Sequence, residues 1–410
     1  MKRTAFLAPL LLLYLAIVLA TSDNELRGDE PRYLWFANNL ARGYYSPADD
    51  ASLWNGPGYP LVLLPFVLLK LPLILAKILN AFFLFGAVLC FHRAIRLYAA
   101  ERQATVFAYL FGVYPPLVRQ SNALLTESLG LFLVSGFMLF FCRLHRSDSR
   151  SRVSLLLASG FLAYLALTKI FFGYVLAAML LWSLVFGFFR RTPALKKTRG
   201  VFALALAFCV PYLAYTYSLT GRLFCWGDSG GMSLYWLSSP HANELGDWYS
   251  DRDVRMIPEL AENHGAFFEE ISKLNHLERD DAFKKRALEN FARHPRKIAE
   301  NWSANVGRLL FSYPFSYTPQ KLSTYFYLVP NMFLVVLSVL SLYPAFRARE
   351  RIGHEIRLLL LFASLAFLGS SFLSAYERQF RVIVPIVGLW LTFVLTRIVA
   401  LRIRGAQGDS

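Results

Sequence analysis

The sequence predicts an all-α polytopic membrane protein with about ten transmembrane helices, interfacial helices and one larger outer loop domain. Composition is the first observation behind this prediction. Of 410 residues, 56% are hydrophobic and only 17% are charged, whereas soluble domains carry about 25% charged residues. The second observation is a series of long apolar runs. The third is a difference in charge between the loops on the two sides of those runs.

The apolar runs give the number and order of the spans, because a spanning helix needs about 20 predominantly apolar residues. Residues 59–71 are interpreted as a half-helix or interfacial segment broken near Lys70 and Pro72. Residues 153–189 are interpreted as two spans hinged near Thr168 and Lys169. The ten predicted spans are 5–20, 73–91, 104–118, 124–142, 153–168, 170–189, 201–219, 325–345, 358–373 and 382–400.

The charges of the loops orient these spans. The loops on one side hold 21 Lys and Arg against five Asp and Glu, and those on the other side hold 20 against 22. The positive-inside rule makes the basic side cytoplasmic, with both termini on it, in the plasma membrane or a bacterial inner membrane. The net charge of +16 therefore follows the loops and does not form one patch, which excludes a nucleic-acid partner and leaves membrane lipids.

Three regions follow from this topology. Residues 1–220 are predicted to form an N-terminal transmembrane module that includes the first outer loop, 21–58. Residues 221–323 form an outer loop region with amphipathic helices, and 324–410 form the C-terminal transmembrane helices. Within the outer region, the stretch 294–311 spaces apolar residues along one helical face, which favours a helix lying on the membrane surface.

Residues 227–231 read Gly-Asp-Ser-Gly-Gly, the string that surrounds the nucleophilic serine of trypsin-like proteases. A nucleophilic serine needs a base and a group that orients the base. Nothing resembling the two β-barrels that carry that site precedes Ser229, and His241 and His264 follow it. We interpret the segment as a glycine-rich turn at the start of an outer loop.

The first outer loop holds the first candidate site residues, Asp29 and Glu30. Pro31 and Gly43 suit the beginning and end of a helix, which places both carboxylates at its amino end. The positive end of a helix dipole keeps a carboxylate ionised, and helix capping by acidic residues is the alternative explanation. The apolar face of this helix holds Tyr33, Phe36, Ala37 and Leu40.

Other candidates come from later outer segments. Glu127 lies between two short spans, so its loop dips toward the bilayer, where a carboxylate is either functional or paired with Arg119. Lys169 either snorkels to the headgroups or faces a site. Arg378 and Arg381 are either anchors at a span end or a clamp for an anionic group such as phosphate.

The order of these motifs resembles the GT-C superfamily of membrane glycosyltransferases, in particular protein O-mannosyltransferases and lipid A aminoarabinose transferases. The resemblance lies in Asp29-Glu30-Pro31-Arg32-Tyr33 and in four further strings of similar order along the chain. Those strings are "NGPGYPL" at 55–61, "LLTESL" at 124–129, "LTGRLFCWGDSGGMSLYW" at 219–236 and "YERQFRVIVPI" at 376–386. Lipid A aminoarabinose transferases have a lysine just before the prolines of the motif that "NGPGYPL" resembles, where this chain has Trp54, Asn55 and Gly56.

The resemblance implies transfer of a sugar, with inversion, from a polyprenyl-phosphate donor to a hydroxyl of a lipid, glycan or protein acceptor on the outer face. Asp29 would be the catalytic base and Glu30 would support it. Glu127 would position acceptor or donor, and Lys169, Arg378 and Arg381 would bind phosphate. Asp29 and Glu127 would share a divalent cation if they converge, and no other cofactor or metal site is predicted. A lipid-linked oligosaccharide transporter or flippase is the alternative, although its ionisable residues would be expected near mid-span.

Overall fold

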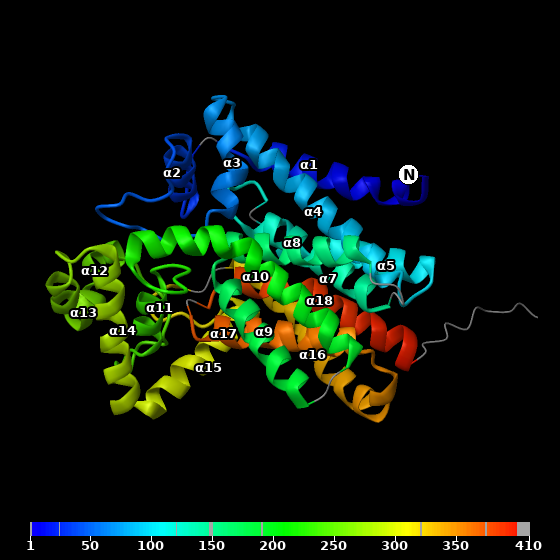
Figure 1. The fold of residues 1–410 in the computed structure, drawn as a ribbon. Helices are drawn as coiled ribbons and strands as arrows, with labels where there is room; N and C mark the ends of the chain where they lie inside the picture. The colour runs from blue at the N-terminus through cyan, green and yellow to red at the C-terminus, as the bar shows by residue number, and fades with distance from the viewer. Residues whose placement is uncertain are drawn as a thin grey trace, which may run out of the picture.

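The computed structural model describes residues 2–23, 25–119, 121–146, 151–189, 192–319, 322–373 and 375–399. Every regular element in these segments is helical, as predicted (Figure 1). The first half holds α1 (Ala8–Thr21), α2 (Glu30–Ala41), α3 (Gly58–Leu68), α4 (Leu73–Ile95), α5 (Glu101–Gly112), α6 (Pro115–Val118), α7 (Glu127–Arg146), α8 (Arg152–Thr168), α9 (Phe171–Phe189) and α10 (Pro193–Thr220). The second half holds α11 (Gly230–Leu237), α12 (Asp251–Met256), α13 (Pro258–Glu270), α14 (His276–Arg293), α15 (Pro295–Phe311), α16 (Tyr325–Arg347), α17 (His354–Ser371) and α18 (Glu377–Phe393).

Seven helices are long and apolar enough to cross a membrane: α4, α7, α9, α10, α16, α17 and α18 with its continuation to Ile398. Three shorter apolar helices accompany them, at Ala5–Thr21, Gly58–Leu68 and Arg152–Thr168. The protein is therefore a multi-pass membrane protein, and nine of the ten predicted spans correspond to one of these helices. The half-helix before Lys70 and the hinge after Thr168 are both present.

The predicted span 104–118 is wrong as a single helix. The chain forms α5 to Gly112 and α6 from Pro115 instead. Pro115 and Pro116 explain the break. A proline has no backbone N–H to donate within a helix, and it disfavours the helical conformation of the residue before it. Residue 119 and residues 121–126 are not helical either, so one continuous helix does not lead to Glu127.

The helices build two hydrophobic cores. The larger one joins side chains from α1 to α10 with those of α17 and α18. A smaller one lies within the outer region, among α11, α13 and α14, and is built around Trp236, Phe268 and Phe283. Figure 1 shows α2 and α11 to α15 gathered at one end of the molecule, opposite the amino end of α1 and the carboxyl end of α18.

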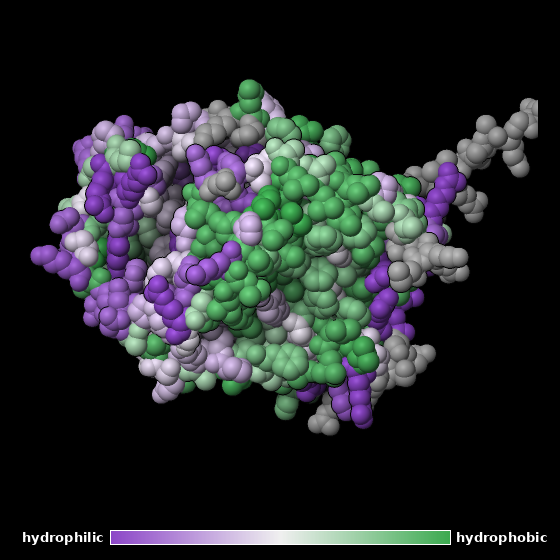
Figure 2. All heavy atoms as spheres, turned by 90° about the horizontal axis from the view of Figure 1, so that it is seen from above, coloured by the Kyte–Doolittle hydropathy of each residue, from purple (hydrophilic) through white to green (hydrophobic). Residues whose placement is uncertain are grey.

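Polar and apolar side chains are also separated along the surface, from one end of the molecule to the other (Figure 2). Figure 2 shows a broad hydrophobic area over the helices, between a polar end and polar side chains at the opposite edge. Exposed apolar residues of α9 and α16, such as Phe188 and Phe333, contribute to the apolar surface of the molecule. Such a large exposed apolar surface fits lipid contact. Residues 400–410, on which the predicted position of the C-terminus depends, lie outside the described residues.

The stretch 294–311 forms α15 as predicted, but its packing differs from that of a helix on the membrane surface. Asn301, Asn305 and Arg308 are buried on its inner face. Asn301 donates to the carbonyls of Leu237 and Ser239, and Asn305 donates to that of Ser371. Because these side chains bond backbone carbonyls on both sides, α15 connects the outer helices to the spans.

Candidate active site

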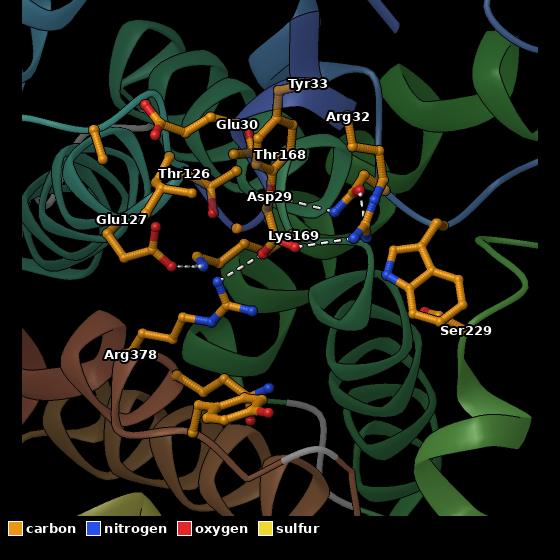
Figure 3. Close-up of a pocket in the computed structure, with 18 of the residues that line it drawn as sticks. Asp29, Glu30, Arg32, Tyr33, Thr126, Glu127, Thr168, Lys169, Ser229 and Arg378 are labelled. Carbon is orange, nitrogen blue, oxygen red and sulfur yellow. Dashed lines mark hydrogen bonds and ion pairs between the residues drawn. The ribbon is translucent and has the colours of Figure 1, made fainter. Parts of the chain in front are cut away.

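A cavity of about 630 Å³ lies where the amino ends of α2, α7 and α18 meet the turn between α8 and α9 (Figure 3). Each helix contributes a candidate residue at its first turn: Asp29 and Glu30 at α2, Glu127 at α7 and Arg378 at α18. The turn contributes Lys169. The amino ends of three helices face this cavity, and the positive ends of their dipoles favour an anionic group that lies beside them.

Asp29 is held at the centre of this cavity by two arginines (Figure 3). Its Oδ1 lies 3.0 Å from Nη2 of Arg32, one helical turn away on α2. Its Oδ2 lies 2.8 Å from Nη1 of Arg378, which reaches across from α18. The Asp29 side chain retains 20% exposure, so the carboxylate is fixed in place and still accessible from the cavity.

Glu127 forms a second ion pair in the same cavity. Its Oε1 lies 3.1 Å from Nζ of Lys169; the Glu127 side chain is buried and that of Lys169 is partly buried. Its other oxygen, Oε2, is buried and accepts no hydrogen bond from the described residues. The sequence analysis gave Arg119 as the alternative partner of Glu127. In the structure the Arg119 guanidinium lies over the Tyr327 ring, with its Cζ 4.8 Å from the ring centroid.

Two glycines allow the Lys169 side chain to reach Glu127. A Cβ at Gly130, one turn into α7, would lie 3.2 Å from Cε of Lys169, so a larger residue would push the lysine away. Gly56 packs against the last turn of α8, where a Cβ would collide with the Leu167 carbonyl. The glycines of the "NGPGYPL" string thus fix the turn that carries Lys169.

Glu30 lines the cavity, but its carboxylate is already used. Its Oε1 accepts from the Leu124 amide at 2.7 Å, and its Oε2 accepts from the Arg27 amide at 2.9 Å. Glu30 therefore ties the amino end of α2 to the coil before α7. Both of its oxygens thus accept backbone hydrogen bonds beside Asp29.

Arg381 differs from its predicted place beside Arg378. It is buried, and its Nη1 donates to the carbonyls of Pro116 and Arg119 at 2.7 and 3.0 Å. It does not line the cavity. Buried backbone carbonyls need hydrogen-bond donors, and the Arg381 guanidinium donates to both of these. The predicted clamp of two arginines is therefore not formed.

The structure adds three polar residues that the sequence did not single out as site residues. Arg32 pairs with Asp29, and Tyr33 accepts a hydrogen bond from Nδ2 of Asn55 at 3.2 Å. Burial raises the pKa of the Tyr33 hydroxyl above its ordinary value, and the nearby Asp29 carboxylate acts in the same direction. Lys77 lines the cavity and donates to the Asp23 carbonyl at 2.7 Å. Lys77 could have been found from the sequence, because it is a lone lysine in the apolar run 73–91.

Comparisons with known proteins were made for sequence and for structure. No protein-family model matches the sequence, and no curated protein matches it. The fold is similar to that of the oligosaccharyltransferase of Archaeoglobus fulgidus in its apo form, with a TM-score of 0.55 and 13% identity over 96% of this chain and 50% of that one. A second structure of this enzyme, AglB with an inhibitory peptide and a dolichol-phosphate, gives a TM-score of 0.53 and 15% identity, covering 97% and 50%. The chain has a GT-C fold.

The chain spans about half the length of these oligosaccharyltransferases. ArnT from Cupriavidus metallidurans bound to undecaprenyl phosphate is also similar, with a TM-score of 0.44 and 14% identity over 95% of this chain and 78% of that one. The GT-C fold confirms the predicted architecture of the chain. The roles of individual residues depend on the geometry described above.

A divalent cation shared by Asp29 and Glu127 does not fit this GT-C cavity. Each carboxylate already faces a basic side chain, and Arg378 lies close enough to interact with both. Within the described residues, no group of three or more His, Cys, Asp or Glu side chains is arranged to hold a metal ion. The residues therefore fit an ion-pair network that accepts an anion, and we assign no chemical step to a metal.

Ser229 lines the cavity of the GT-C fold, but no catalytic triad surrounds it. It lies immediately before α11, and its carbonyl accepts a hydrogen bond from Ser233. His264 is bonded elsewhere, to Tyr235 and Glu244 in the outer region. The Gly-Asp-Ser-Gly-Gly string is not a turn throughout, as interpreted from the sequence: residues 227–229 are non-helical, and Gly230 and Gly231 begin α11.

Proposed function

We propose that the protein is a glycosyltransferase that moves a sugar from a polyprenyl-phosphate donor to an acceptor hydroxyl, with inversion at the anomeric carbon. The observation that carries the proposal is the accessible Asp29 carboxylate, held between Arg32 and Arg378 in a cavity that also presents Lys169. A base beside cations for a departing phosphate is the minimum that this reaction requires. The dolichol-phosphate bound to AglB supports a lipid phosphate in this fold.

Asp29 is the general base of the proposed reaction. The acceptor oxygen attacks the anomeric carbon and its proton passes to a carboxylate oxygen of Asp29. The bond between that carbon and the phosphate oxygen breaks, and polyprenyl phosphate leaves with the electron pair. Because a phosphate is a good leaving group, the reaction needs no general acid. A single carboxylate therefore suffices.

Arg378 and Lys169 stabilise the phosphate. Arg378 is bonded to Asp29 and lies within electrostatic reach of Glu127. A phosphate entering the cavity competes for its guanidinium, since arginine binds phosphate through two parallel hydrogen bonds. Transfer of Arg378 from Asp29 to the phosphate frees Oδ2 of Asp29 for the acceptor proton. Donor binding thereby prepares the base.

The site is assigned to the outer face of the membrane. The cavity is lined by residues of α2 and by Ser229, Ser233 and Trp248 of the outer region. Figure 1 shows α2 and the helices of the outer region at the end of the molecule away from the amino end of α1. The basic loops between the spans, with residues such as Arg93, Arg143 and Arg347, belong to the cytoplasmic side by the positive-inside rule. The acceptor then approaches from the compartment outside the cytoplasm.

The proposal is tested with purified protein, a panel of radiolabelled polyprenyl-phosphate sugars and a membrane extract as the source of acceptors. We expect one donor to lose its label to an acceptor, with release of polyprenyl phosphate. If every donor keeps its sugar while labelled lipid crosses the bilayer of reconstituted vesicles, the protein is a transporter and the proposal is wrong.

A further inference from the structure

A second cavity of about 530 Å³ adjoins the candidate active site, between the first outer loop and the outer helices. Three tryptophans line it: Trp35, Trp54 and Trp248. Trp54 and Trp248 meet edge to face, with their ring centroids 6.1 Å apart. Five aspartates share the lining with the arginines Arg32 and Arg279; the aspartates are Asp49, Asp50, Asp228, Asp251 and Asp280.

We propose that this cavity binds the acceptor and that the acceptor is an uncharged carbohydrate; this inference rests on the proposed glycosyl transfer. A sugar ring has an apolar face of C–H groups and a rim of hydroxyls. Aromatic rings bury the first, and carboxylates accept hydrogen bonds from the second. The lining combines both kinds of side chain around one space.

Asp228 is the clearest polar feature of this cavity. It is 4% exposed, and its Oδ2 accepts from the Leu53 amide at 2.7 Å. Its Oδ1 is buried and accepts no hydrogen bond from the described residues. A buried carboxylate oxygen without a donor is costly. An acceptor hydroxyl that enters the cavity would satisfy it.

The two cavities share part of their walls. Arg32, Trp54 and Trp248 line both of them. The guanidinium of Arg32 lies 5.1 Å from the centroid of the Trp54 ring and is bonded to Asp29. A sugar stacked on Trp54 would therefore lie next to the arginine that holds the proposed base.

The charge of the cavity favours an uncharged occupant over an anionic one. Aspartates outnumber arginines in its lining, and the Arg279 guanidinium already pairs with Asp251. Asp50 lies 3.8 Å from Nε2 of the His276 ring and accepts a hydrogen bond from the His276 amide at 3.5 Å. A phosphorylated or uronate-rich acceptor would meet repulsion here, because like charges in a partly buried site destabilise each other.

The experiment measures binding without any donor, so that it does not depend on catalysis. Full-length protein in nanodiscs is titrated with mannotriose, maltotriose, chitotriose, trigalacturonate and a serine- and threonine-rich peptide, and tryptophan fluorescence is followed. Maltoside detergents are avoided because they carry a sugar. We expect saturable binding of a neutral trisaccharide and none of trigalacturonate.

Variants locate the binding. Trp248→Ala is expected to weaken binding about tenfold, or about 1.4 kcal/mol, whereas Trp248→Phe keeps a stacking ring and most of the affinity. Trp182→Ala removes a tryptophan of α9 that does not line either cavity and should leave the affinity unchanged. Tighter binding of the peptide or of trigalacturonate, or no effect of Trp248→Ala, overturns the inference. Neutral-sugar binding in a protein that transfers no sugar would support the cavity and refute the proposed function.

Discussion

The Glu127–Lys169 pair gives a prediction whose size follows from the structure. Two opposite charges 3.1 Å apart attract each other by about 5 kcal/mol at an effective dielectric constant near 20. The Glu127 side chain is buried, with 5% exposure, and the Lys169 side chain is partly buried, with 16%, so water screens the pair only in part. Glu127→Gln leaves Lys169 without its counter-charge, and breaking such a pair costs about 3–5 kcal/mol. We expect the free energy of unfolding to fall by that amount.

The assay is denaturant unfolding of the purified protein in detergent, followed together with sugar transfer. Adding Lys169→Met to Glu127→Gln removes both charges and should recover most of the lost stability, while transfer stays low because the cation for phosphate is absent. Glu300→Gln, which breaks the exposed Arg296–Glu300 pair, is the matched control and should cause no measurable loss. Equal stability of Glu127→Gln and wild type would refute the reasoning. Full transfer activity in the double variant would remove Lys169 from the phosphate site.

Three further predictions concern Asp228, Arg381 and metal ions. Burial raises the pKa of Asp228 to about 6; Asp280 acts in the same direction and His276 against it. Protonated Asp228 therefore favours the folded protein. Its contribution to the free energy of unfolding is present below the unfolded pKa of about 4 and is lost as pH rises through 6. Asp228→Asn should therefore be more stable than wild type at pH 7.5, by up to about 3 kcal/mol, and equal to it at pH 4 in thermal unfolding; the opposite order would contradict the assignment. Arg381→Met should lower the melting temperature without changing the KM for the donor, and a raised KM would return Arg381 to the phosphate site. Transfer should continue after dialysis against EDTA, measured as label moved per minute, whereas loss of transfer that Mg²⁺ restores would show that a metal takes part.

Much of the fold was predictable because its signals are local. An apolar run records burial in lipid residue by residue, and the break at Lys70 and the hinge after Thr168 are marked in the sequence itself. The helix break at Pro115 was also visible as a Pro-Pro pair, but the prediction weighted hydropathy over chain geometry. The boundaries 1–220, 221–323 and 324–410 stay a prediction.

The site was predictable in part for a related reason. Asp29 and Glu127 stand out because a carboxylate at a membrane surface or in a dipping loop is unusual. Which cation faces each of them is decided by the packing of helices far apart in sequence: Arg378 reaches Asp29 from α18. Arg381 lies one turn further along the same helix and donates to the Pro116 and Arg119 carbonyls instead. Sequence spacing alone does not distinguish these two environments.

The central claim is that Asp29 removes the acceptor proton, and the most direct measurement compares the transfer rate of wild type with that of Asp29→Asn at saturating donor. Asparagine keeps the size of the side chain and removes its basicity, so we predict a loss of about 100-fold or more. Asp281→Asn, which changes an exposed aspartate paired with Arg222, should transfer at the wild-type rate. Equal rates for wild type and Asp29→Asn would contradict the account.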